Sequence, residues 1–169
     1  MRYENVRPFM KSGDLVAFSY RAPTFSSWYA FKVRMVRAFT SSEYSHIGVV
    51  WVPPGGRVFL LEAVVPKVRI YPLSNALEEG EDLYHIPLNC DWPRAEEMAL
   101  RHVGQDYSQL LAVMAYFKAV DHQENTECAL FARDVLRCAG VELGDKATPT
   151  EIVRQAQLQG ATLTLITKD

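Results

Sequence analysis

Cysteine is scarce in this 169-residue sequence, and neither sign of charge dominates. The three cysteines, Cys90, Cys128 and Cys138, are too widely spaced for a CxxC metal pair and too few for a disulfide framework. An odd count leaves at least one thiol free, which suits a reducing compartment or a reactive thiol. A net charge of -2 without a basic stripe gives no reason to expect a nucleic-acid partner. We expect neither a metal nor a cofactor.

Targeting and membrane-spanning segments are also missing from the sequence. Residues 1–14 contain no apolar signal segment, so we expect no signal peptide. The longest apolar stretch, residues 110–117, is shorter than the ~20 residues that a membrane span requires. With 49% apolar and 22% charged residues, the composition is that of a soluble globular protein.

The apolar pattern predicts one α+β domain over residues 1–169, with an antiparallel sheet or small barrel flanked by helices. Both faces of the central hairpin are apolar, so we expect helices to cover the sheet on both sides. The predicted strands are 15–18, 47–52, 58–65, 68–71, 83–86 and 161–167, with a turn at 53–56. The predicted helices are 25–39, 93–103, 108–120, 128–139 and 149–159, the last begun by a Thr148–Glu151 capping box.

Cys128 stands at the start of a predicted helix, where Asn125 or Thr126 can supply the N-cap oxygen. Unpaired backbone N–H groups and the positive end of the helix dipole favour a thiolate there. The same N–H groups can receive the oxyanion of a tetrahedral intermediate. On the helix alone, however, core packing is the first interpretation, because free cysteine is often a small buried hydrophobe. Cys128 belongs to an apolar stripe with Phe131, Ala132, Val135, Cys138 and Ala139.

His46 and Glu62 are the predicted partners of this thiol. A hairpin loop of three or five residues would place them directly opposite each other, on one face of the sheet. Glu62 could then accept the Nδ1–H of His46 and direct Nε2 toward a thiol. Glu62 stands inside the apolar run VFLLEAVV, where a carboxylate requires a partner. The alternatives are a structural histidine and a solvated edge glutamate. Gly48, on the same face, leaves room for a substrate or a helix.

Several short elements occur in the order found in one enzyme family. They are Ser12-Gly13-Asp14-Leu15-Val16, Tyr44-Ser45-His46-Ile47-Gly48-Val49-Val50, Leu61-Glu62-Ala63, Gly104-Gln105-Asp106-Tyr107, Glu127-Cys128-Ala129-Leu130-Phe131 and Thr148-Pro149. Together they resemble the circularly permuted branch of the NlpC-type papain-like cysteine peptidases, the YiiX-like proteins. The order His, Glu, Cys is the one that permutation produces, since the chemistry depends on spatial geometry and not on chain order.

The resemblance implies roles for individual residues. Cys128 would be the nucleophile, His46 the general base and then acid, and Glu62 the orienting third residue. Tyr107 matches the tyrosine of a Gly-x-x-Tyr element near the active cysteine, or else is a packed aromatic at a helix start. Ala129 is a departure, because relatives usually have serine after the cysteine. Tyr107 and Ala129 are candidate substrate or oxyanion residues.

The resemblance leaves the substrate open. NlpC-type relatives imply peptide amides of the bacterial cell wall, which a chain without a signal peptide would reach through a phage particle, host lysis or another export route. We therefore expect a cytoplasmic or phage-associated protein. The fold also resembles lecithin:retinol acyltransferase-like enzymes, which implies acyl lipids. Residues 25–39 and 110–117 would suit a lipid groove or peripheral membrane contact, or pack into the core. The third alternative is a non-catalytic module that binds a lipid or peptide.

Overall fold

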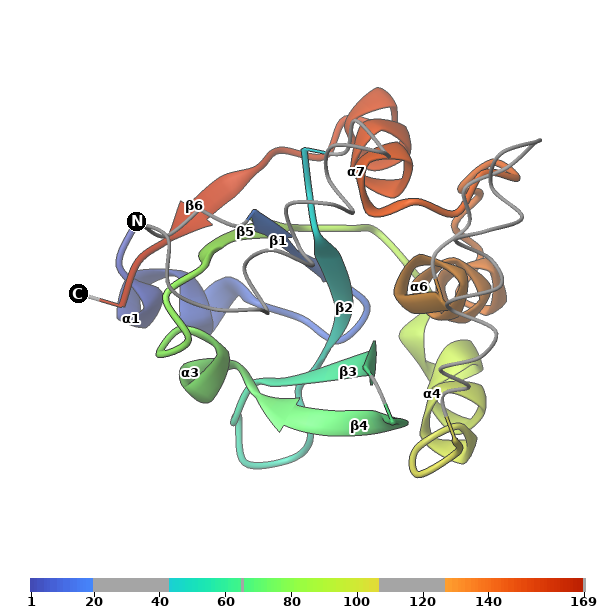
Figure 1. Cartoon of the computed structure of the whole chain (residues 1–169), viewed down its shortest axis with the longest axis horizontal. Coiled ribbons are helices and arrows are strands. Elements are labelled where there is room, and N and C mark those ends of the chain that lie inside the picture. Colours follow the sequence, from blue (N-terminus) through green and yellow to red (C-terminus); the bar gives the residue numbers. More distant parts are fainter. Residues whose placement is uncertain (20–42, 65, 107–126, 169) are drawn as a thin grey trace.

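The computed structural model describes residues 1–19, 43–64, 66–106 and 127–168. Its centre is an antiparallel six-stranded sheet with the strand order β4-β3-β2-β1-β5-β6 (Figure 1). The strands are β1 (Leu15–Ser19), β2 (His46–Trp51), β3 (Phe59–Val64), β4 (Lys67–Pro72), β5 (Asp82–Ile86) and β6 (Thr164–Ile166). The predicted α+β class is confirmed.

Three of the predicted helices are confirmed: α4 (Trp92–Arg101), α6 (Glu127–Cys138) and α7 (Pro149–Leu158). Three short elements were not predicted, because a single turn is too short to show helical periodicity: α1 (Tyr3–Val6), the 3-10 helix η1 (Arg7–Phe9) and α3 (Leu73–Ala76). The helices predicted at 25–39 and 108–120 lie outside the described residues. In the described parts of the chain, every helix is too short or too polar to cross a bilayer.

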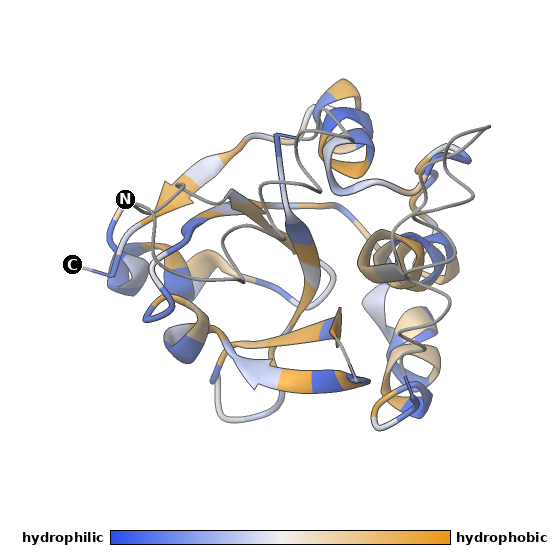
Figure 2. Ribbon diagram, in the orientation of Figure 1, coloured by the Kyte–Doolittle hydropathy of each residue, from blue (hydrophilic) through white to orange (hydrophobic). Residues whose placement is uncertain are grey.

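Alternating residues of the strands pack into two separate apolar cores, one on each face of the sheet. Leu15 and Ala17 of β1 pack into the core that also contains residues of α4, α6 and α7. Val16 and Phe18 point the other way, into the core formed with α1 and α3. Figure 2 shows the apolar colouring along β2 and β3 that accompanies this arrangement. The prediction that helices cover both sides of the sheet is confirmed, and period-two alternation explains it.

The ends of α7 differ in part from the prediction. The Thr148 hydroxyl caps the helix by accepting the Glu151 N–H at 3.1 Å. The Glu151 carboxylate binds Arg154 and Gln155 instead of returning to Thr148, so the reciprocal half of the predicted capping box is replaced. The final strand begins at Thr164 and not at 161, because the N–H of Ala161 bonds back to α7.

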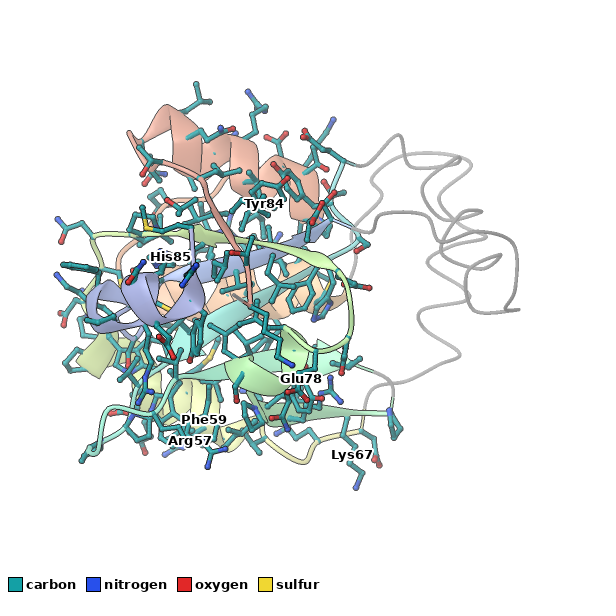
Figure 3. The ribbon with its side chains drawn as sticks, turned by 90° about the vertical axis from the view of Figure 1, so that its left-hand side faces the viewer. Arg57, Phe59, Lys67, Glu78, Tyr84 and His85 are labelled. Carbon is teal, nitrogen blue, oxygen red and sulfur yellow. The ribbon has the colours of Figure 1, made fainter. Side chains whose placement is uncertain are left out.

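The Ser12-Gly13-Asp14 turn ties β1 to β5. The Asp14 carboxylate is buried and accepts hydrogen bonds from His85 Nε2 at 2.8 Å and Leu88 N–H at 3.0 Å; Figure 3 labels His85 on β5. Gly13 adopts φ 94°, and a Cβ there would lie 2.1 Å from Cys90 Sγ. Position 13 therefore requires glycine, and half-buried Cys90 has a packing role against it.

We expect Asp14→Ala to lower the free energy of unfolding by about 3–5 kcal/mol, because it leaves buried His85 and the half-buried Leu88 N–H without their acceptor. Urea denaturation measures this loss. Asp91→Ala is the matched control, since the Asp91 side chain is exposed and its carboxylate, among the described residues, has only a 3.9 Å contact with Arg94. Equal, small effects of the two substitutions would contradict a structural role for the Asp14 carboxylate.

Candidate active site

Glu62 is a carboxylate buried in the middle of β3, with its side chain only 2% exposed. Its Oε2 accepts the Nε2–H of His46 at 2.7 Å, and its Oε1 accepts the Nε–H of Arg69 at 2.7 Å. Each carboxylate oxygen thus has a charge-assisted partner, which offsets the cost of burial. The expectation of a partner for Glu62 is confirmed, and the solvated edge glutamate is excluded.

The predicted register of the β2–β3 hairpin is wrong by two residues. Val49 pairs with Leu61 and Val50 with Leu60, so Glu62 faces Gly48 and not His46. A Cβ built on Gly48 would lie 3.5 Å from the Glu62 Cβ, which agrees with this pairing. Because the register differs by an even number of residues, His46 and Glu62 still lie on the same face of the sheet, as predicted. Gly48 has no side chain to block the diagonal path from Glu62 to His46.

The ring of His46 is also turned the other way from the prediction. Nε2, and not Nδ1, bonds to Glu62. A diagonal partner is farther away than one directly opposite, so the ring reaches it with the nitrogen farther from the backbone. Nδ1 is then the nitrogen that remains for the hydrogen bond between His46 and the Cys128 side chain. Phe18 packs edge-on against the ring, with centroids 5.0 Å apart.

Cys128 is the second residue of α6 and is 6% exposed. Its burial in the core is what the packing interpretation predicts, and its hydrogen bond with His46 is what the nucleophile interpretation predicts. Ala129 follows it and is fully buried. If the helix begins where the sequence predicts, the amide groups of Cys128 and Ala129 lie in its first turn and are the candidate oxyanion donors. Tyr107, Asn125 and Thr126 lie outside the described residues.

The charges around His46 favour an imidazolium. Burial would lower the pKa of His46, but the Cys128 sulfur and the Glu62 carboxylate outweigh burial and raise this pKa to about 10. Burial pushes the pKa of Glu62 upward, yet hydrogen bonds and charges from His46 and Arg69 hold it below its ordinary value. The arrangement therefore favours a Glu62 carboxylate and a His46 imidazolium beside the Cys128 sulfur at neutral pH.

The start of β2 is held from two sides. The Thr150 hydroxyl, in the first turn of α7, accepts the backbone N–H groups of Glu43 and Tyr44 at 3.0 and 3.3 Å. The Ser45 N–H bonds to the Phe18 carbonyl at 2.8 Å. These contacts fix the backbone immediately before His46.

Sequence reasoning missed Arg69 and Thr150. Arg69 could have been found, because only two residues separate β3 from β4 and a tight hairpin pairs Glu62 with Arg69. Nothing in the sequence indicates that Thr150 reaches residues 43 and 44. Cys138 is exposed, and neither it nor Cys90 joins the site. Within the described residues, no cluster of three metal-binding side chains occurs.

A scan against protein-family models found no matching family, and a search of curated proteins found no matching relative.

We expect Cys128→Ala to lower the pKa of His46 below about 10, because the sulfur's charge and hydrogen bond are lost while burial remains. The imidazole should then lose its proton at lower pH than in the wild type. Proton–nitrogen NMR of the side chain, assigned with His46→Asn, measures both titrations. Identical titration curves would show that no thiolate stands beside His46.

Thr150→Val should lower the free energy of unfolding by about 0.5–1.5 kcal/mol, since one exposed and one half-buried N–H group lose this acceptor. Thr150→Ser keeps the hydroxyl and serves as the control. Urea denaturation of the three proteins gives the comparison, and equal stabilities would exclude the proposed anchoring of residues 43 and 44.

Proposed function

We propose that this chain is a cysteine-dependent amidase or peptidase with a permuted papain-like fold, acting through Cys128, His46 and Glu62. The observation that supports this most is the continuous contact from Glu62 through His46 to Cys128. A structural histidine can also have a buried carboxylate partner, as His85 has in Asp14. His46 differs because it joins such a carboxylate to a cysteine side chain, and in a nucleophilic site the third group orients the base and stabilises its charged form.

The mechanism would be a two-step acyl transfer. The Cys128 thiolate attacks the carbonyl carbon of the substrate, and the amide groups at the start of α6 stabilise the oxyanion. The His46 imidazolium donates its Nδ1 proton to the leaving amine as the C–N bond breaks. His46 then removes a proton from water, which attacks the thioester and releases the acid and the free thiol. Glu62 stays ionised throughout.

The substrate class follows from the resemblance to NlpC-type enzymes, and we propose peptide amides of the cell-wall type. A histidine that carries a proton at neutral pH is suited to amide cleavage, because an amine is a poor leaving group until it is protonated. Acyl-ester lipids, with transfer in place of hydrolysis, form the competing class in a substrate screen.

Iodoacetamide should modify Cys128 about ten-fold faster than exposed Cys138 at pH 7, because the thiolate is the reacting form. Cys128→Ala should abolish turnover and this labelling, and Cys128→Ser should abolish turnover. His46→Asn should slow the labelling of Cys128 without changing that of Cys138. Peptide mapping by mass spectrometry measures both sites in one sample.

Slow, equal labelling of Cys128 in the wild type and in His46→Asn would contradict the catalytic proposal. Turnover is then screened with muropeptides against acyl-ester lipids. Cleavage of the peptides supports the amidase proposal, whereas release of acyl groups from lipids alone overturns the substrate class. A pocket that retains ligand with an unreactive Cys128 would indicate a binding module.

A further inference from the structure

Arg69 is the second partner of the Glu62 carboxylate and lies directly opposite it in the β3–β4 pairing. Its Nε–H donates to Oε1 of Glu62 at 2.7 Å, and its NH2 group lies 2.7 Å from the same oxygen. His46 uses Oε2, the other oxygen. The carboxylate is therefore held at both ends, which fixes its plane and its distance from the imidazole.

The guanidinium of Arg69 is itself held in place. It stacks over the ring of Tyr71, 4.1 Å from the centroid, and Tyr71 lies two residues along the same strand. The Tyr71 hydroxyl donates to Glu79 Oε1 at 2.8 Å. The Arg69 side chain is 44% exposed although its partner Glu62 is 2% exposed. The positively charged guanidinium of a partly exposed arginine thus contacts a buried carboxylate.

A simple structural ion pair would not require this arrangement. His46 alone already gives Glu62 one charged partner, and Arg69 adds a second one on the other oxygen, so both favour the ionised carboxylate. If Arg69 were absent, Glu62 could rotate about its terminal bond or take up the proton of His46. Either change would remove the fixed negative charge behind the imidazolium, and with it the support for the Cys128 thiolate.

We propose that Arg69 is a positioning residue of the active site, which acts through Glu62 to keep His46 oriented and Cys128 in its reactive form. This inference rests on the proposed function and adds Arg69 to the three proposed catalytic residues. Arg69 contacts the Glu62 carboxylate, and its effect on Cys128 would pass through that carboxylate and His46.

The test is the pH profile of Cys128 alkylation by iodoacetamide in the intact chain, compared between the wild type, Arg69→Met and Arg69→Lys. In Arg69→Met the acidic limb should move to higher pH by about one unit, which makes alkylation about ten-fold slower at pH 6. The rates should converge at pH 10, where the thiol ionises without help. Arg69→Lys keeps the positive charge but lacks the two guanidinium nitrogens that contact Glu62, so it should recover part of the lost alkylation rate.

Arg57→Met is the matched control, because Arg57 also stacks on a strand aromatic, Phe59, at 5.4 Å from the ring centroid; Figure 3 labels both residues. Its profile should equal that of the wild type. In a Glu62→Gln background, Arg69→Met should have no further effect on the profile. A full effect in that background would show that Arg69 does not act through Glu62 and would overturn the inference.

Carbon NMR titration of the Glu62 carboxyl separates this inference from the proposed function. If Cys128 is unreactive in the wild type, the proposed function fails, but Glu62 should still titrate at higher pH in Arg69→Met than in the wild type. An unchanged Glu62 titration overturns the positioning role, whether or not Cys128 is reactive. Thermal melting of each variant distinguishes a shifted profile from loss of the fold.

Discussion

The buried carboxylate of Glu62 is the constraint on which the site depends. A charge in the middle of an apolar sheet is tolerated only when its oxygens are hydrogen-bonded to charged donors. One oxygen bonds to His46 on the strand before it, and the other bonds to Arg69 on the strand after it. Three adjacent strands therefore contribute to one chain of polar contacts, from Arg69 through Glu62 to His46, across an otherwise apolar region. The last contact in this chain joins His46 to Cys128 of α6.

The contact between His46 and Cys128 requires elements that are far apart in the chain. β2 brings His46 as its first residue, and α6 brings Cys128 in its first turn. The core that contains Leu15 and Ala17 holds α6 against the sheet, and Thr150 of α7 anchors the backbone before His46. The thiol is consequently packed as a core residue and also hydrogen-bonded to His46. Core packing and a bond to a polar side chain are therefore compatible at this position.

Most of the sheet could be predicted from the sequence because apolar alternation and β-branched runs depend on the local chain. The six strands and the helices α4, α6 and α7 follow from such patterns, whereas one-turn helices such as α3 leave none. For the site, the even separation of His46 and Glu62 was sufficient to place both on one face of the sheet. The exact register could not be predicted, since it depends on where the turn closes. The contact of Thr150 with residues 43 and 44 joins distant segments, and no local pattern encodes it.

The diagonal register has chemical consequences that direct opposition would lack. With Glu62 facing Gly48, the carboxylate lies diagonal to His46 and bonds to Nε2, which leaves Nδ1 for the Cys128 side chain. A Cβ at position 48 would lie 3.5 Å from the Cβ atoms of Glu62 and Leu60, so the Glu62 side chain packs directly against the Gly48 backbone. The pairing of β3 with β4, closed by its own tight turn, independently sets Glu62 directly opposite Arg69. Two separate strand registers thus place His46 and Arg69 at the two oxygens of one carboxylate.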